Sequence, residues 1–129
     1  MTPRRVLLVF VGGAVGTAGR LALGLWIADA GGFPIATFVV NVVGALLIGV
    51  LAARMPQSTD LRVLLGTGVL GGFTTYSAFM TGTVELWSAT PALAAVYAVG
   101  SLVLGLAAAA LGLRLGRPRG TARPAEAAS

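Results

Sequence analysis

The sequence predicts an all-α membrane protein built from four spanning helices. Of its 129 residues, 57% are hydrophobic and only 10% are charged, and the mean hydropathy is +0.92. About a quarter of the residues of a typical soluble domain are charged, so this composition excludes an ordinary soluble protein. Four apolar stretches, at residues 6–28, 35–53, 63–87 and 92–115, each approach the ~20 residues that a helix needs to cross a bilayer. Helices are expected because an unpaired strand leaves its backbone unsatisfied in lipid.

Short segments with helix-breaking residues connect the four stretches. Gly31, Gly32 and Pro34 lie in the first connection, Pro56 lies in the second, and Pro91 ends the third. Short connections require neighbouring helices to run antiparallel, so residues 1–115 are interpreted as one four-helix transmembrane domain. Residues 116–129 alternate Arg, Pro, Gly and Ala with nothing to bury, which predicts a disordered basic tail.

The arginines are distributed unequally between the two ends of the predicted bundle. The end with both termini and the middle connection has eight of them: Arg4, Arg5, Arg54, Arg62, Arg114, Arg117, Arg119 and Arg123. The other end has none, only Asp29 and Glu85. The positive-inside rule therefore predicts a multi-pass protein of the cell membrane with both termini in the cytoplasm. Anionic membrane lipid explains the arginines, so nucleic acid is not expected as a partner.

The composition also argues against an enzyme. The chain has no Cys and no His, which excludes thiol catalysis, Cys/His zinc sites and an imidazole general base. Residues 66–71 match the glycine pattern of a dinucleotide-binding loop, but no strand precedes them and no βαβ unit surrounds them. There is no paired carboxylate or catalytic triad, so we expect no organic cofactor and no catalytic residue.

Polar side chains inside the first two spans are candidate functional residues, because they cost free energy in lipid unless protein, water or a ligand meets them. Arg20 lies on one stripe of the first span with Gly16 and Gly24. It is either paired at a close helix contact or placed at the mouth of an anion path. Asn41, in the middle of the second span, either forms an interhelical hydrogen bond or offers its two N–H donors to a small anion.

The third span contains the unusual string GGFTTYSAF at residues 71–79. The glycine pair weakens the helix at its centre, and freed carbonyls must be met by protein, water or a cation such as Na⁺. A packing kink with hydroxyls bonded to their own helix is the alternative. Tyr76 and Phe79 share one helix face, where they either pack or turn ring edges to an anion. In the fourth span, Tyr97 and Ser101 form either a polar track or interhelical hydrogen bonds.

Together these features strongly resemble the Fluc/CrcB family of fluoride channels. The resemblance covers residues 6–115 and rests on the glycine-rich first span with Arg20, VNVVG at 40–44, GGFTTYSAF at 71–79, and Tyr97 with Ser101. It implies four helices per subunit with the third broken at its centre, an antiparallel dimer with two fluoride paths, and a structural Na⁺ at the dimer centre. The implied role is the passive exit of cytoplasmic fluoride down its gradient, which reduces fluoride toxicity.

The resemblance also implies roles for individual residues. Asn41 would donate hydrogen bonds in the pore, Tyr76 and Phe79 would present ring edges to fluoride, and Arg20 would stand near a vestibule. Backbone carbonyls of Gly71 and Thr74 would coordinate Na⁺. Many members have Phe where this chain has Tyr76. The expected pore residues are Arg20, Asn41, Thr75, Tyr76, Ser77, Phe79, Tyr97 and Ser101.

The unequal arginine distribution adds a hypothesis about the partner subunit. An antiparallel homodimer requires one sequence to insert in both orientations, and that requires a weak charge bias. The strong bias here favours a heterodimer with a homologous subunit of opposite orientation, with a homodimer as the alternative. Two other functions are considered. A small multidrug-type exporter needs a carboxylate deep in the first span, where Arg20 stands instead, and a noncatalytic membrane scaffold predicts no ion flux.

Overall fold

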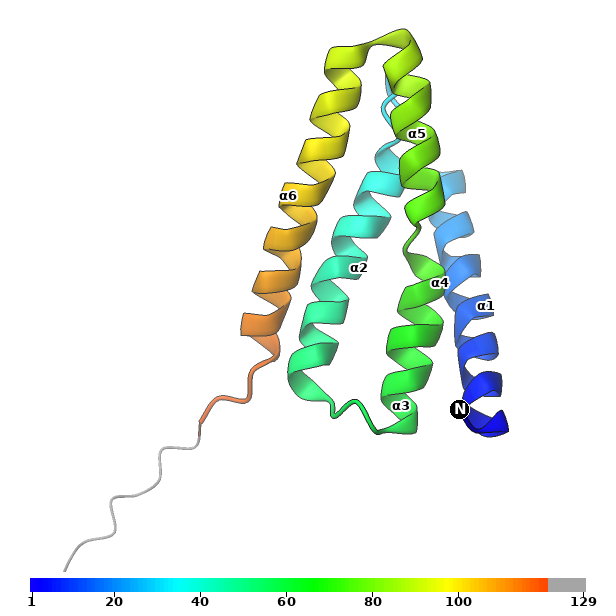
Figure 1. Cartoon of the computed structure of the whole chain (residues 1–129), viewed down its shortest axis with the longest axis vertical. Helices are drawn as coiled ribbons and strands as arrows, with labels where there is room; N and C mark the ends of the chain where they lie inside the picture. Colours follow the sequence, from blue (N-terminus) through cyan, green and yellow to red (C-terminus); the bar gives the residue numbers. More distant parts are fainter. Residues whose placement is uncertain (121–129) are drawn as a thin grey trace, which may run out of the picture.

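The computed structural model describes residues 1–120, which form an all-helical bundle (Figure 1). Four helices are long and apolar enough to cross a membrane: Pro3–Trp26, Ile35–Arg54, Asp60–Ala89 and Pro91–Gly116. They coincide with the four predicted stretches, which confirms the prediction of an all-α protein with four spanning helices. Within the described residues the only extended pairing is an isolated bridge between Ala30 and Phe33, in the first connection.

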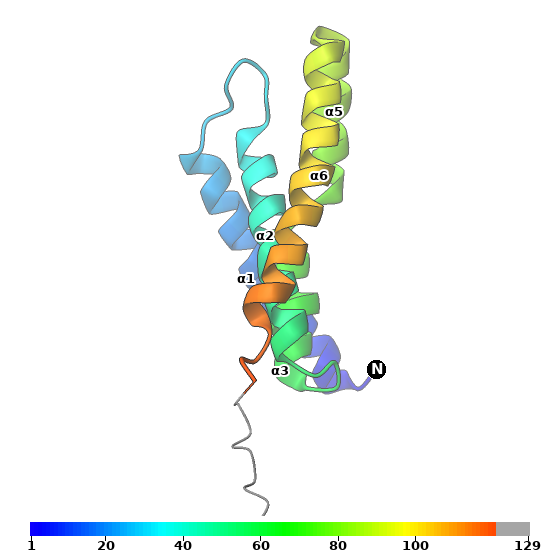
Figure 2. The ribbon, with the colours of Figure 1, turned by 90° about the vertical axis from the view of Figure 1, so that its left-hand side faces the viewer.

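The spans are built from seven helical elements, which Figure 1 labels where there is room. They are α1 (Pro3–Trp26), α2 (Ile35–Arg54), α3 (Asp60–Arg62), the π-helix η1 (Val63–Leu70), α4 (Gly71–Phe73), α5 (Tyr76–Ala89) and α6 (Pro91–Gly116). α1 packs against η1 and α4, α2 packs along α6, and α5 packs on α6. Figure 2 shows α5 and α6 side by side, with the connection between α1 and α2 leaning away from them.

The third span contains two residues with extended backbone. Thr74 has φ −77° and ψ 156°, and Thr75 has φ −149° and ψ 120°, between the end of α4 and the start of α5. We call these two residues the 74–75 link. The sequence places the weakened point of the helix at the glycine pair, but Gly71 and Gly72 are themselves helical in α4, and the extended residues lie three positions later.

Glycines allow the close approach of α1 to the third span. A Cβ on Gly12 would lie 2.6 Å from the carbonyl oxygen of Leu64, and a Cβ on Gly72 would lie 2.9 Å from the Cα of Gly13. α2 meets α6 in the same way at Gly49. Backbones that approach this closely maximise van der Waals contact, which is how helices associate in lipid. Gly72 is therefore helical because it packs, although glycine alone would loosen a helix.

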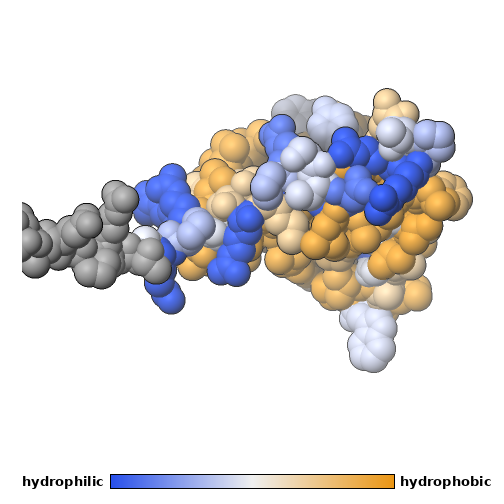
Figure 3. All heavy atoms as spheres, turned by 90° about the horizontal axis from the view of Figure 1, so that it is seen from below, coloured by the Kyte–Doolittle hydropathy of each residue, from blue (hydrophilic) through white to orange (hydrophobic). Residues whose placement is uncertain are grey.

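Polar groups tie the N-terminus of α1 to the start of the third span. Arg4 and Arg5 form ion pairs with Asp60 at 3.2 and 3.1 Å, and Arg5 also donates a hydrogen bond of 2.6 Å to the carbonyl of Ser58. Figure 3 views this end of the molecule and shows the hydrophilic side chains gathered on it. The arginines of the connections therefore lie at one end of the bundle, as the sequence predicts.

α6 ends at Gly116, one residue beyond the predicted end of the transmembrane domain. Residues 117–120 follow it without regular secondary structure. The predicted disordered tail covers residues 116–129, and from residue 121 onward it lies outside the described part of the chain.

Candidate functional site

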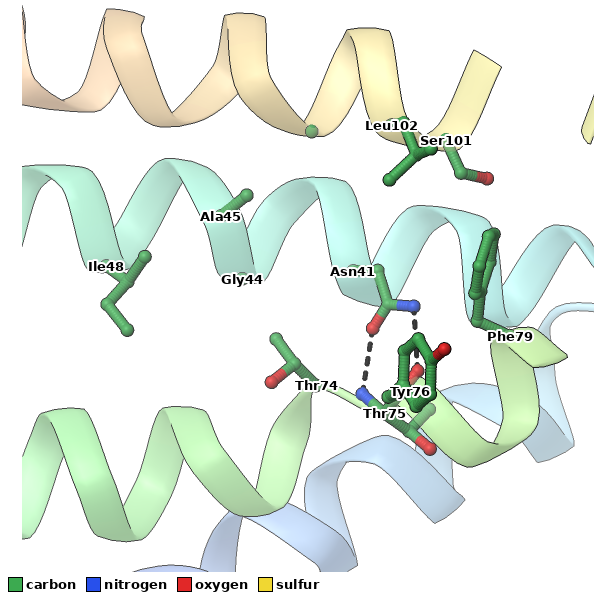
Figure 4. Close-up of a pocket in the computed structure, with 11 residues that line it drawn as sticks. Asn41, Gly44, Ala45, Ile48, Thr74, Thr75, Tyr76, Phe79, Ser101 and Leu102 are labelled. Carbon is green, nitrogen blue, oxygen red and sulfur yellow. Dashed lines mark hydrogen bonds between the residues drawn. The ribbon is translucent and has the colours of Figure 1, made fainter. Parts of the chain in front are cut away.

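The 74–75 link removes a backbone hydrogen bond that a continuous helix would form. In an α-helix the N–H of Thr75 would donate to the carbonyl of Gly71, four residues earlier. Here it donates instead to Oδ1 of Asn41, at 2.8 Å, and Nδ2 of Asn41 donates back to the carbonyl of Thr75 at 3.0 Å (Figure 4). One amide side chain from α2 therefore satisfies both backbone polar groups of Thr75. The Gly71 carbonyl loses its helical donor.

The carbonyl of Gly72 is met by donors from α1. Thr17 Oγ1 and Arg20 Nε both donate to it, each at 3.3 Å. A cation near the carbonyl end of a helix is also favoured by the helix dipole, here that of the run from α3 through α4. The structure thus places Arg20 at a helix contact. It also places Arg20 beside a cavity of about 270 Å³ that Thr37 and Thr75 help to line.

The hydroxyls of the 74–75 link differ in their partners. Thr74 Oγ1 donates to the carbonyl of Leu70 at 2.9 Å, so this hydroxyl is bonded to its own helix. Thr75 Oγ1 accepts from the N–H of Ala78 at 3.2 Å, which caps the start of α5. The same oxygen lies 3.2 Å from Oγ of Ser77. Thr75 and Ser77 therefore form an exposed hydroxyl pair at the N-terminus of a helix.

A pocket of about 330 Å³ opens beside the link, between α2, α5 and α6. Figure 4 shows Asn41 at the centre of this pocket, with the hydroxyl of Ser101 and the rings of Tyr76 and Phe79 to one side of it. Eleven residues line it: Asn41, Gly44, Ala45, Ile48, Thr74, Thr75, Tyr76, Phe79, Ser101, Leu102 and Gly105. We call it the central pocket.

The two aromatic rings at the central pocket have different environments. Their centroids are 6.2 Å apart, and the planes are tilted by 39°. Tyr76 is 75% exposed, so the described chain covers little of this ring. Phe79 packs against Tyr97 of α6, with centroids 5.5 Å apart. Only Phe79 is therefore held in place by neighbours within the chain.

Two hydroxyls of α6 are buried without a partner. Tyr97 is fully buried between aromatic neighbours, and its ring packs on Phe33 at 5.2 Å. Neither the hydroxyl of Tyr97 nor that of Ser101 has a hydrogen-bond partner among residues 1–120. A buried polar group without a partner costs about 1–3 kcal/mol, so such groups call for a reason. Of the two residues, Ser101 lines the central pocket, whereas Tyr97 lies in the buried aromatic cluster.

Most of the expected pore residues meet at one place. Asn41, Thr75, Tyr76, Phe79 and Ser101 all line the central pocket, whereas Tyr97 contacts it through Phe79 and Ser77 through Thr75. Arg20 lies apart from them, in the smaller cavity that shares Thr75 with the central pocket.

Sequence reasoning missed Thr17, which meets the Gly72 carbonyl together with Arg20. Its signal was a hydroxyl three residues before Arg20, and therefore on the same face of the first helix.

Comparison with known proteins gives one family and many relatives. Residues 7–113 match the family described as CrcB-like protein, Camphor Resistance (CrcB). The chain is 44% identical over 119 residues to a protein of Agrobacterium fabrum named fluoride-specific ion channel FluC, covering 87% of this chain and 95% of that protein. It is 47% identical over 111 residues to fluoride-specific ion channel FluC 2 of Rhodococcus jostii, covering 85% of this chain and 96% of that protein. A FluC protein of Novosphingobium aromaticivorans is 48% identical over 118 residues, with 84% and 93% covered.

Proposed function

This chain belongs to the CrcB-like family, a family of ion channels rather than enzymes, and from that membership we propose that it is a fluoride-selective channel. It is a multi-pass membrane protein by its four spanning helices. In the cell membrane it lets cytoplasmic fluoride leave down its gradient, and this exit reduces fluoride toxicity. The observation that carries the proposal is the central pocket, where groups able to donate hydrogen bonds to a small anion meet beside the 74–75 link.

Fluoride holds its water strongly, so a path for it must offer replacement donors. Asn41 has two N–H donors and uses one of them on the Thr75 carbonyl, which leaves the other for an anion. The hydroxyl of Ser101 has no partner within the described residues. In the Thr75 and Ser77 pair one hydroxyl donates to the other, which leaves one O–H for an anion. These donors are neutral, so they can solvate an anion without holding it as a full positive charge would.

The aromatic residues fit the same proposal. Ring edges carry partial positive charge, so Tyr76 and Phe79 can turn an edge to fluoride. Arg20 contributes its charge from the smaller cavity on the other side of Thr75. Tyr97 supports the position of Phe79 by packing against its ring and extends the row of hydroxyls along α6.

We also propose a structural Na⁺ that is bound by backbone carbonyls of Gly71 and Thr74. Na⁺ is a hard cation that takes oxygen ligands, and unwound helix segments supply them in membrane proteins. The Gly71 carbonyl fits this role because the N–H of Thr75, its donor in a continuous helix, donates to Asn41 instead. The neighbouring carbonyl of Gly72 is already engaged by Thr17 and Arg20, so it is not included.

The functional unit is proposed to be an antiparallel dimer in which a second subunit covers the central pocket. In each span, only 11% to 22% of the apolar 18-residue stretch is buried within this chain. Most of the helix surface is therefore left for lipid or a partner. The arginine distribution favours a homologous partner of opposite orientation and cytoplasmic termini for this subunit. Mapping terminus accessibility of the chain expressed alone tests this choice. Two orientations in comparable amounts would contradict the heterodimer.

Fluoride efflux from liposomes tests the channel itself. Vesicles are loaded with fluoride or chloride and contain this chain alone or with a candidate partner, and protein-free vesicles serve as the control. We expect efflux of fluoride without efflux of chloride. If the heterodimer is correct, this efflux requires the sample that contains the partner. Equal efflux of both anions would contradict fluoride selectivity. No efflux in any sample would contradict the proposal and favour a scaffold.

A further inference from the structure

A second cavity lies at the arginine-rich end of the bundle, next to the central pocket. Its volume is about 380 Å³, and it is enclosed by the end of α2, the connection that follows it, and η1. It is lined by Ile48, Gln57, Arg62, Val63, Gly66 and Thr67. Ile48 also lines the central pocket, so the two cavities adjoin. We call this second cavity the Arg62 cavity.

The guanidinium of Arg62 is fixed in position. Its Nη1 donates to the carbonyl of Met55 at 2.7 Å and to that of Leu51 at 3.4 Å, both at the end of α2. The Met55 carbonyl lies beyond the last turn of α2 and has no helical donor, whereas the Leu51 carbonyl also accepts from the N–H of Met55 at 2.9 Å, so the Met55 carbonyl is the main anchor of the guanidinium. The Nε and Nη2 groups of Arg62 have no acceptor within the part of the chain that the structure describes. They are therefore free to donate to a ligand.

The charge of Arg62 is not neutralised by a neighbour within residues 1–120. Asp60 is two residues away in the chain, but its carboxylate is paired with Arg4 and Arg5. A partly buried cation that has lost water and has no counter-ion attracts an anion.

Gly66 keeps the cavity open beside Arg62, and Gln57 and Thr67 add polar groups to its lining. A Cβ on Gly66 would lie 3.7 Å from Nε of Arg62 and 3.2 Å from Cδ2 of Leu51, so glycine leaves that side of the guanidinium uncovered. The hydroxyl of Thr67 and the amide of Gln57 are not hydrogen-bonded to any residue from 1 to 120, and both can donate. A guanidinium, an amide and a hydroxyl thus line one cavity, in which Gln57 and Thr67 are exposed.

We propose that the Arg62 cavity binds a small inorganic anion with part of its water, and that the anion is fluoride held before it enters the central pocket. This inference rests on the proposed function. The volume admits a fluoride ion with several waters, each of which occupies about 30 Å³ in the liquid. A fixed cation at the mouth of a path raises the local concentration of anions, which matters most when fluoride is scarce. An anionic lipid headgroup has the same chemistry, and vesicles with and without anionic lipid separate the two.

Efflux rates measured over a range of internal fluoride test the inference. Thr67→Val removes a hydroxyl at nearly constant volume, and Gln57→Glu places a negative charge on the cavity. Ser58→Glu is the matched control, because it adds the same charge one residue further along and outside the cavity. Each protein is assayed in vesicles of neutral phosphatidylcholine and in vesicles that also contain phosphatidylglycerol.

We expect Thr67→Val and Gln57→Glu to slow efflux at least threefold at low fluoride, in both lipids, and to approach the unmodified rate at high fluoride. Convergence at high fluoride also reports that the variants are folded. Unchanged rates at low fluoride, or an equal loss in Ser58→Glu, would overturn the proposal. An effect confined to the vesicles that contain phosphatidylglycerol would overturn fluoride as the ligand and assign the cavity to an anionic lipid headgroup. No fluoride flux from the unmodified protein would instead refute the proposed function.

Discussion

Asn41 and Thr75 are 34 residues apart in the chain and are joined by two hydrogen bonds, of 3.0 and 2.8 Å, between one side-chain amide and both backbone polar groups of the threonine. These bonds fix the 74–75 link to α2. They also direct the Thr75 N–H away from the Gly71 carbonyl. A single side chain thus shapes both the proposed fluoride path and the proposed sodium site.

Replacing this amide by a carboxylate tests its role as a donor. Asn41→Asp keeps an acceptor for the Thr75 N–H, removes the donor to the Thr75 carbonyl, and adds a negative charge in the central pocket. We expect fluoride efflux to fall by about tenfold or more, since one lost charge-assisted interaction is worth that much in rate. Thr83→Val is the control, because that hydroxyl donates only to its own helix, at 2.8 Å. Efflux at the unmodified rate in Asn41→Asp would contradict the assignment.

The unpartnered hydroxyls of α6 predict opposite effects on stability and on transport. Tyr97→Phe and Ser101→Ala each remove a buried hydroxyl that has no partner within the described chain. We expect the free energy of unfolding in detergent to stay the same or rise, by up to about 2 kcal/mol, while fluoride efflux falls. A lower free energy of unfolding with unchanged efflux would show that these hydroxyls are structural hydrogen bonds.

The close contact between α1 and the third span predicts a steric effect at Gly72. The added Cβ in Gly72→Ala meets the backbone of Gly13, so we expect the free energy of unfolding to fall by about 1–3 kcal/mol. Gly100→Ala is the matched control, since nothing lies within 4 Å of its added Cβ. Equal stability of the two variants, measured by chemical unfolding in detergent, would show that α1 does not pack this closely.

Removal of sodium tests the proposed cation site. Vesicles and protein are prepared with a large organic cation in place of Na⁺, and fluoride efflux is followed before and after Na⁺ is returned. We expect efflux to be lost and then restored, because the carbonyls of Gly71 and Thr74 need a cation to be held together. Equal efflux with and without Na⁺ would contradict the proposed sodium site.

The four spans could be predicted from the sequence, because length and apolar composition alone determine which segments can cross a bilayer. The position of the extended backbone could not. The glycine pair is the locally weakest point, yet Gly72 is helical because it packs on α1, and the extended link is at residues 74–75, where Asn41 can reach it. Both causes are contacts between segments far apart in the chain, which local propensity does not contain.

The candidate site, like the fold, could be predicted only in part. Polar residues inside apolar spans identified Asn41 and Ser101, and the structure brings both to the central pocket. For Asn41 the interhelical hydrogen bond is present, and one N–H remains, so both alternatives considered from the sequence stay compatible with the structure. Thr17 and the Arg62 cavity were missed because their importance depends on which backbone carbonyls lie next to them. The roles of all these residues in conduction stay predictions.

The most direct test of a fluoride path through the central pocket compares two phenylalanines. Phe79 lines the pocket, whereas Phe38 packs against the same buried cluster around Tyr97 but does not line it. If fluoride passes through the central pocket, Phe79→Ile abolishes fluoride efflux from liposomes while Phe38→Ile conducts, with chloride retained in both. Equal fluoride efflux from the two variants would contradict this path.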